Sequence, residues 1–351
     1  MNPDETHDED EGEDWRSVST RRPSPRSLTL AQSRAREPGR GRTADDPAQI
    51  PAMGWKDVFW RVLYSVPRDR VFATAGGVAF FTLLATFPAL ATIVSVYSLF
   101  SDPHAISQHV SLLAGVLPGG VLDLLSDQLV RVAQQSTGAL STASLVGVLI
   151  ALWSANSGVS ALFDALNVIY REREKRSLMR FYATTFLFTL SGILFALTAT
   201  SLVVILPIAL NQLGLGVLAD VTLRLVRWPG LLVLVSLGLA VTYRYGPSRR
   251  EAKWRWVSWG GVAAAVSWVC ASVSFSWYVA SFDSYNRIYG SLGAGVGFMT
   301  WIWFSVVIVL LGAKLNAEIE RQTARDSTTG RPKPLGSRDA HAADTIGPPE
   351  G

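Results

Sequence analysis

The feature that most constrains this chain is a series of six long apolar segments. They lie at about residues 73–100, 142–169, 181–209, 228–245, 256–280 and 296–316. An α-helix rises about 1.5 Å per residue, so each segment can cross a hydrocarbon core about 30 Å thick. The fourth is the shortest and begins at Trp228 and Pro229, so a helix start within 217–227 would lengthen it. The pattern predicts an all-α membrane protein, a bundle of six transmembrane helices.

Composition agrees with a membrane protein. Only 17% of the 351 residues are charged and 49% are hydrophobic, whereas a soluble domain carries about 25% charged residues. The basic residues also alternate between connections. The loops 171–180 and 244–255 each hold five Lys or Arg, whereas 101–141 holds only Arg131 and 281–295 only Arg287. Because basic loops stay in the cytoplasm, both termini are predicted to be cytoplasmic.

The segments outside the bundle are polar or amphipathic. We expect a disordered cytoplasmic tail over 1–52, a six-span membrane domain over 53–322 and a second disordered cytoplasmic tail over 323–351, because such polar sequences bury little apolar surface. Residues 54–66 place Trp55, Phe59, Val62 and Val66 on one helical face, which predicts an interfacial helix before the first span. Residues 121–135 predict an amphipathic helix on the outer surface.

The second apolar segment carries a polar stripe. Asn156, Ser160, Asp164 and Asn167 lie with Trp153 within an arc of about 80° on a helix. Asp164 lies about two turns, or roughly 9 Å, inside Tyr170, too deep for a short carboxylate to reach the interface. Two interpretations stay open. The stripe lines a polar pathway or ion site, or its side chains hydrogen-bond neighbouring helices together.

Other residues within the spans also have two interpretations. Lys314 is four residues before Glu318, so it forms a salt bridge or interface anchor, or it joins the polar pathway and pairs with Asp164 at the same depth. Pro88 removes a backbone hydrogen bond within the first span and predicts a kink. Gly290, Gly293 and Gly297 provide close helix packing or a flexible hinge.

Motifs of several chemistries are absent. There is no GxxxxGK[ST] loop and no GxGxxG fingerprint, so no nucleotide cofactor is predicted. The histidines are His7, His104, His109 and His341, and their spacing does not fit a metal site. We predict no catalytic residues, no cofactor, no metal and no nucleic-acid partner. The sequence therefore does not favour an enzyme.

Three stretches carry a family resemblance. AGGVAFFTLLATFPAL (75–90), LWSANSGVSALFDALNVIY (152–170) and YGSLGAGVGFMTWIWFSVVIVLLGAKLNAEI (289–319) resemble the YihY/BrkB family of bacterial inner-membrane proteins. The resemblance covers about 54–322 and implies six spans with both termini inside. Members often carry Glu where Lys314 stands here. The family once carried a ribonuclease name, and members are linked to serum resistance and to envelope lipid transport.

These observations together predict a transporter-like protein of the cell envelope that moves a lipid, an ion or a solute. The polar stripe would give a headgroup or ion its path, and the basic loops would attract anionic headgroups of membrane lipids. Without a nucleotide motif, movement would be passive or ion-coupled. The alternative is a non-transporting scaffold for envelope assembly. A ribonuclease is disfavoured, because the sequence shows no catalytic cluster.

Overall fold

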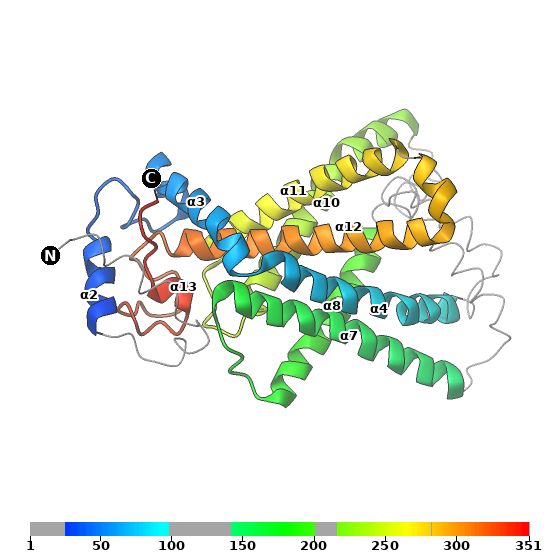
Figure 1. The fold of residues 1–351 in the computed structure, drawn as a ribbon, viewed down its shortest axis with the longest axis horizontal. Coiled ribbons are helices and arrows are strands. Elements are labelled where there is room, and N and C mark those ends of the chain that lie inside the picture. The colour runs from blue at the N-terminus through cyan, green and yellow to red at the C-terminus, as the bar shows by residue number, and fades with distance from the viewer. Residues whose placement is uncertain (1–24, 98–141, 201–215, 282, 351) are drawn as a thin grey trace.

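The computed structural model describes residues 25–97, 142–200, 216–281 and 283–350 of the chain, and these are helical apart from turns and loops. The six long helices are α4 (Val71–Tyr97), α7 (Thr142–Tyr170), α8 (Leu178–Thr200), α10 (Gly216–Tyr245), α11 (Trp254–Ser281) and α12 (Asp283–Glu320) (Figure 1). Four shorter elements lie at one end of the bundle: α2 (Pro25–Arg34), η2 (Pro47–Gln49), α3 (Ala52–Arg68) and α13 (His341–Asp344). We call this end the polar end.

The predicted all-α class is confirmed, and the helices agree with the predicted segments in most places. Four stretches are long and apolar enough to cross a membrane: Leu149–Tyr170, Leu178–Ala196, Trp254–Tyr278 and Gly295–Glu320. Within the described residues, α4 and α10 are apolar over the shorter stretches Val71–Thr86 and Pro229–Tyr245. The number of six spans therefore stays a prediction.

The largest difference from the predicted segments concerns residues 281–295, which we expected to be a connection. In the structure α12 already begins at Asp283 and runs for 38 residues. The stretch contains several glycines but no proline, and glycine is tolerated inside membrane helices. The backbone hydrogen bonds of the helix therefore continue through the glycines. Similarly, α10 begins at Gly216, so the fourth helix does include residues 217–227.

The bundle is built around α12. This helix packs against α4, α7 and α11, and near its C-terminus against α3. On one side α4 packs on α7 and α7 on α8; on the other, α11 packs on α10. By contrast, α8 and α10 make few contacts with each other. The arrangement is an open arc that leaves a gap between these two helices.

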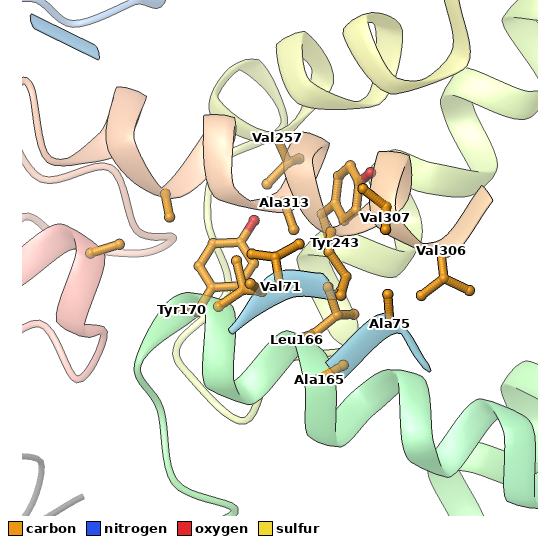
Figure 2. Packing of buried hydrophobic residues seen from close by; sticks show 14 of the residues in the cluster. Val71, Ala75, Ala165, Leu166, Tyr170, Tyr243, Val257, Val306, Val307 and Ala313 are labelled. Atoms are coloured by element: carbon orange, nitrogen blue, oxygen red, sulfur yellow. The ribbon is translucent and has the colours of Figure 1, made fainter. Parts of the chain in front are cut away.

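The apolar core lies where five of these helices meet (Figure 2). Val71 and Ala75 of α4 pack with Leu166 of α7 and with Val306 and Val307 of α12. Tyr243 of α10 and Val257 of α11 belong to the same cluster. Small residues in this set allow close approach of the helices, which favours dispersion contacts in a membrane bundle.

Large apolar side chains also cover the outside of the bundle. Leu149, Leu194, Val233, Val273 and Trp277 are each more than half exposed. Exposed apolar surface of this extent is unfavourable in water. The long apolar helices and their apolar outer faces indicate that the bundle is surrounded by lipid.

The C-terminal segment differs from the expected disordered tail. Residues 323–350 pack against the polar end, and many of their side chains are buried. The guanidinium of Arg338 donates to the backbone carbonyls of Ala324, Arg325 and Ala343. Side chains thus supply the hydrogen bonds that a short polar segment cannot obtain from helices or sheets. Residues 1–24 and the predicted outer-surface helix at 121–135 lie outside the described residues.

The predicted helix at 54–66 is present as α3, but its buried face is different. Asp57, Val58 and Arg61 point into the protein, and Phe59 is 62% exposed. Arg61 is not among the residues of the predicted apolar face, yet it is 5% exposed. Its burial follows from ion pairs that sequence periodicity does not reveal.

Candidate functional site

The polar stripe of α7 does not form one continuous feature in the structure. Asn156 is buried, and its Oδ1 accepts a hydrogen bond from Thr189 Oγ1 of α8 at 3.4 Å. The Ser160 hydroxyl is buried and has no hydrogen-bond partner among the described residues. Asp164, in contrast, is exposed. Asn156 therefore joins two helices, whereas Asp164 faces outward from the bundle.

Asn167, the last member of the stripe, holds two loops together at the polar end. Its Oδ1 accepts from the Ser248 backbone N–H at 2.7 Å, and its Nδ2 donates to Glu174 Oε2 at 3.0 Å. Burial raises the pKa of Glu174, but hydrogen bonds from Arg176 and Asn167 outweigh burial and bring this pKa to about 2. The amide thus fixes the 171–177 loop against the 246–253 loop.

Lys314 lies in a buried charge network, and not beside Asp164. Its Nζ is 2.6 Å from Asp69 Oδ2 and 3.2 Å from Glu318 Oε1, and the lysine side chain is only 2% exposed. Asp69 in turn lies 3.8 Å from Arg171. The ammonium is therefore satisfied by two carboxylates at the C-terminal end of α12. The pairing considered between Lys314 and Asp164 is replaced by these contacts.

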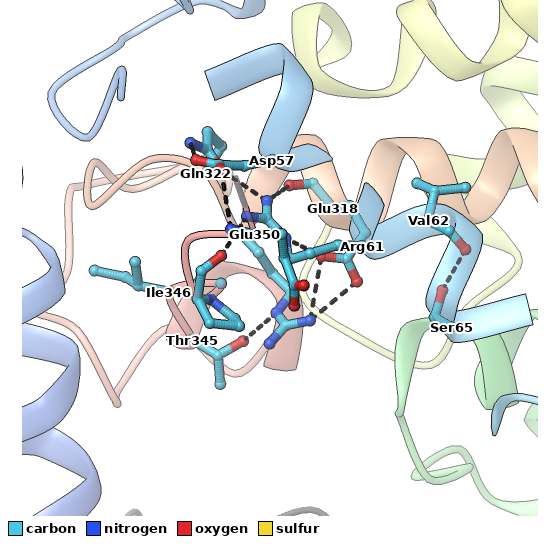
Figure 3. Close-up of polar contacts among 12 residues, drawn as sticks. Asp57, Arg61, Val62, Ser65, Glu318, Gln322, Thr345, Ile346 and Glu350 are labelled. Atoms are coloured by element: carbon cyan, nitrogen blue, oxygen red, sulfur yellow. Dashed lines mark hydrogen bonds and ion pairs between the residues drawn. The ribbon is translucent and has the colours of Figure 1, made fainter. Parts of the chain in front are cut away.

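Glu318 connects this network to α3 (Figure 3). Its carboxylate lies 2.9 Å from Arg61 Nε and 2.9 Å from Arg321 Nη1. Nη2 of the same Arg61 guanidinium donates a hydrogen bond to Gln322 Oε1 at 2.7 Å. One carboxylate thus faces three cations, Lys314, Arg61 and Arg321. Removing the Glu318 carboxylate would leave these buried cations without their shared partner, which is costly.

A second buried ion pair joins the 246–253 loop to α12. Arg249 Nη2 lies 2.6 Å from Glu320 Oε1, and neither side chain is exposed. The guanidinium stacks over the Tyr170 ring at 4.5 Å, and Ser327 donates to the same carboxylate at 2.8 Å. We call the two networks together the polar plate, which comprises Arg61, Asp69, Arg249, Lys314, Glu318 and Glu320. It closes the polar end of the bundle beneath the apolar core.

Glycine packing occurs between α11 and α12. The Asn316 side chain accepts from the Gly260 N–H at 2.7 Å and donates to the Val257 carbonyl at 2.9 Å. A Cβ on Gly312 would lie 2.5 Å from the Tyr243 hydroxyl and 2.8 Å from the Gly260 carbonyl. Glycine is therefore required at position 312 for this close approach, and Asn316 fixes the register.

The residues predicted as hinge or packing elements are placed differently. At Gly297 a Cβ would meet no atom within 4 Å, so no described residue packs against it. Gly290 and Gly293 lie within α12 and Pro88 within α4, but their surroundings lie outside the described part of the structure. Their role in packing or motion stays a prediction.

A large groove lies between α8 and α10, with a volume of about 1120 Å³. We call it the α8–α10 groove. Apolar side chains line most of its length: Leu187, Phe188, Phe195, Leu234, Leu237 and Val241. Its volume exceeds the usual upper range of about 1,000 Å³ for small-molecule sites. It follows the gap in the helical arc, so it opens toward the surrounding lipid.

The mouth of the groove, at the polar end, is strongly basic. Six basic side chains line it, against the acidic pair Glu251 and Asp339: Lys175, Arg176, Arg180, Arg244, Arg249 and Arg250. The two basic loops 171–180 and 244–255, which each hold five Lys or Arg, are therefore brought together at one opening. An apolar channel with a cationic mouth matches the two halves of an anionic amphiphile.

Sequence reasoning located the basic loops but missed the polar plate and the groove. Neither Asp69 nor Glu320 was singled out, and no sequence pattern shows that 171–180 and 244–255 meet. One signal was available: Glu318, Glu320 and Lys314 directly follow a long apolar run. Three charges at the end of a span are costly unless they are paired. No group of three His, Cys, Asp or Glu side chains able to hold a metal is found in the described ranges.

Comparison with known proteins agrees with this architecture. The family model described as "Virulence factor BrkB" matches residues 62–335. The chain belongs to this family. The match covers all six long helices and the start of the C-terminal segment, so the family resemblance seen in the sequence is confirmed.

Curated relatives are similar over much of this chain. The putative ribonuclease-like protein YfkH of Bacillus subtilis is 26% identical over 70% of this chain and 88% of its own length. A UPF0761 membrane protein of Vibrio parahaemolyticus is 28% identical over 75% of this chain and 82% of its own length. A UPF0761 membrane protein of Ralstonia nicotianae is 27% identical over 72% of this chain, and the match covers 56% of that protein's own length. No solved structure matches.

Proposed function

We propose that this multi-pass membrane protein of the BrkB family moves anionic phospholipids between the leaflets of a bacterial inner membrane. The α8–α10 groove carries the proposal. Its apolar wall suits acyl chains, its basic mouth suits an anionic headgroup, and it opens to lipid between two helices that barely touch. The polar end faces the cytoplasm in this account, because it holds the two basic loops.

The groove supports this function better than the α7 stripe does. Asn156 and Asn167 are occupied with hydrogen bonds to Thr189, Ser248 and Glu174, and Lys314 is occupied by Asp69 and Glu318. Side chains bonded in this way connect neighbouring helices and loops. A headgroup would have to displace these bonds, whereas the groove is open.

The test is translocation in proteoliposomes. A headgroup-labelled phosphatidylglycerol is incorporated in both leaflets, and an impermeant quencher reports how fast the inner-leaflet label becomes accessible. Gly192→Phe should block the movement, because Gly192 lines the groove and a Cβ there meets no atom within 4 Å, so the ring fills the groove without a clash. The matched control is Gly77→Phe, which lies on α4, away from the groove, with the same open space.

We expect fast movement with the wild type and with Gly77→Phe, and movement at the level of empty liposomes with Gly192→Phe. If the wild type moves no lipid, the proposed function is wrong and the envelope scaffold takes its place. If Gly192→Phe moves lipid as fast as the wild type does, the groove is not the path.

A further inference from the structure

We infer that Arg244 is the receptor for the phosphate group of a phospholipid bound in the α8–α10 groove. The inference deepens the proposed function and rests on it for the identity of the ligand as a membrane lipid. The inference rests on the geometry of the Arg244 guanidinium and on the residues that line the same mouth of the groove.

Arg244 is 8% exposed and lies at the C-terminal end of α10, where it lines the groove. Its guanidinium stacks on the Trp254 ring at 4.6 Å and lies 5.3 Å from the Tyr245 ring centre. Stacking on an aromatic face leaves the planar edge of a guanidinium free to donate hydrogen bonds. The two rings therefore fix the orientation of this fork without using its donors.

The donors of Arg244 are largely unused. Nε and Nη1 are buried and have no hydrogen-bond partner among the described residues. Nη2 lies 3.7 Å from Glu251, a distance too long for a hydrogen bond, and Glu251 is half-exposed. Buried guanidinium groups are almost always hydrogen-bonded. Because Nη2 also makes no hydrogen bond, either edge of the guanidinium, Nε with Nη2 or Nη1 with Nη2, can present two donors to an acceptor with several oxygens.

The surroundings specify which acceptor fits. Arg250 lines the same groove, and its Nη1 is also buried without a partner within the described chain. Arg176 and Arg249, in contrast, are already paired with Glu174 and Glu320. A phosphate offers the bidentate oxygens that arginine forks bind best, and its negative charge suits two cations whose guanidinium groups donate no hydrogen bond to a carboxylate of the described chain. The apolar wall beyond them fits acyl chains, so a phosphate ester of a lipid fits the whole groove.

The experiment is a binding titration of the full chain in detergent by native mass spectrometry. The probes are dioleoyl phosphatidylglycerol, dioleoylglycerol with the same chains but no phosphate, and inorganic phosphate. The variants are Arg244→Gln and Arg244→Lys, which keeps the charge but loses the planar fork. The matched control is Arg255→Gln, an exposed arginine of the same basic segment that does not line the groove.

We expect phosphatidylglycerol to bind at least about tenfold more tightly than dioleoylglycerol, and both Arg244 variants to weaken it about tenfold, which is about 1.4 kcal/mol. Arg255→Gln should leave the affinity within about twofold of wild type. Equal effects of Arg244→Gln and Arg255→Gln, or equal binding of the two lipids, would overturn the inference. If inorganic phosphate at the same concentration displaces the lipid, the inference that the bound phosphate group belongs to a lipid is overturned.

Two measurements keep the test decisive if Arg244→Gln does not fold. The comparison of the two lipids on the wild type needs no variant, and Arg250→Gln tests the second of these cations. The binding measurement and the translocation measurement can also give different outcomes, which separates this inference from the proposed function. Tight, Arg244-dependent binding without translocation supports this site and rejects the proposed function. Translocation of phosphatidylglycerol at the wild-type rate by both Arg244→Gln and Arg250→Gln rejects this site.

Discussion

Arg61 and Glu318 are 257 residues apart in the chain, and Arg61 Nε lies 2.9 Å from the Glu318 carboxylate with both side chains buried. This ion pair ties α3 to the C-terminal end of α12. It shows that α3 is anchored to the bundle by charge as well as by apolar contacts. The polar plate therefore determines how the polar end is assembled.

Arg61→Gln should destabilise the protein by about 1–3 kcal/mol, because it removes the hydrogen bonds that Arg61 donates to the Glu318 carboxylate and to the Gln322 side chain, both of which are buried. Thermal unfolding in detergent, followed by intrinsic tryptophan fluorescence, measures the loss. Lys56→Gln is the control, since Lys56 is exposed on the same helix. Equal melting temperatures for the two variants would show that the ion pair adds nothing to the anchoring of α3.

Lys314 should couple to Asp69 and not to Asp164. In a double-mutant cycle, Asp69→Asn with Lys314→Met should depart from additivity by about 1 kcal/mol or more, since the two groups lie 2.6 Å apart. Asp164→Asn with Lys314→Met should be additive. Unfolding free energies of the wild type, the three single variants and the two double variants decide the matter, and the reverse pattern would place Lys314 beside the α7 stripe after all.

Gly312→Ala should cost about 1–3 kcal/mol of stability, because its Cβ would overlap Tyr243, Ala264 and the Gly260 carbonyl between α11 and α12. Gly297→Ala on the same helix is the matched control and should be nearly neutral, since its Cβ meets open space. Melting temperatures of both variants provide the measurement. A larger loss from Gly297→Ala would show that a partner outside the described residues packs there.

Acidification should loosen the C-terminal segment through His341. Burial, reinforced by the nearby cations Arg321, Arg171 and Lys314, lowers the pKa of His341 to about 3. A histidine whose folded pKa lies below its usual 6.5 stabilises fully above pH 6.5 and progressively less as the pH falls toward 3. At pH 5 the loss is about 2 kcal/mol, because the unfolded segment binds the proton that the folded one excludes.

Hydrogen–deuterium exchange of residues 337–346 at pH 7.5 and pH 5, corrected for the intrinsic exchange rate, measures this effect. Protection should fall at pH 5 in the wild type. His341→Gln should remove most of the difference between the two pH values, because its amide does not titrate. Identical protection at both pH values in the wild type would mean that His341 is solvated. Glu172 accepts from the His341 backbone N–H at 2.6 Å, and burial raises its pKa, so its protonation on acidification favours the folded state and opposes the effect of His341.

The sequence predicted most of the helices because hydropathy and length determine which segments can enter a membrane. The segments at 142–169 and 256–280 differ from α7 and α11 by two residues or fewer at each end. The start of α12 was missed because glycines and polar residues at 283–295 resemble a loop when neighbouring helices are not considered. Local periodicity cannot show which tertiary contacts continue a helix.

The candidate site was less predictable. The basic loops at 171–180 and 244–255 were interpreted as orientation signals and as attracting anionic headgroups. Sequence alone does not show that α8 and α10 diverge and leave an opening beside these loops. The stripe of Asn156, Ser160, Asp164 and Asn167 was found by angle, yet an angle does not distinguish a side chain in a cavity from one bonded to a neighbouring helix. Asn167 is the clearest case, with both amide atoms engaged.

The most direct test of the account compares Asp164→Asn with Gly192→Phe in the phosphatidylglycerol translocation assay. The account predicts that Gly192→Phe reduces movement to the level of empty liposomes and that Asp164→Asn moves lipid at the wild-type rate. The opposite result, loss with Asp164→Asn and normal rates with Gly192→Phe in folded proteins, would contradict it. The path would then run along α7 and not through the groove between α8 and α10.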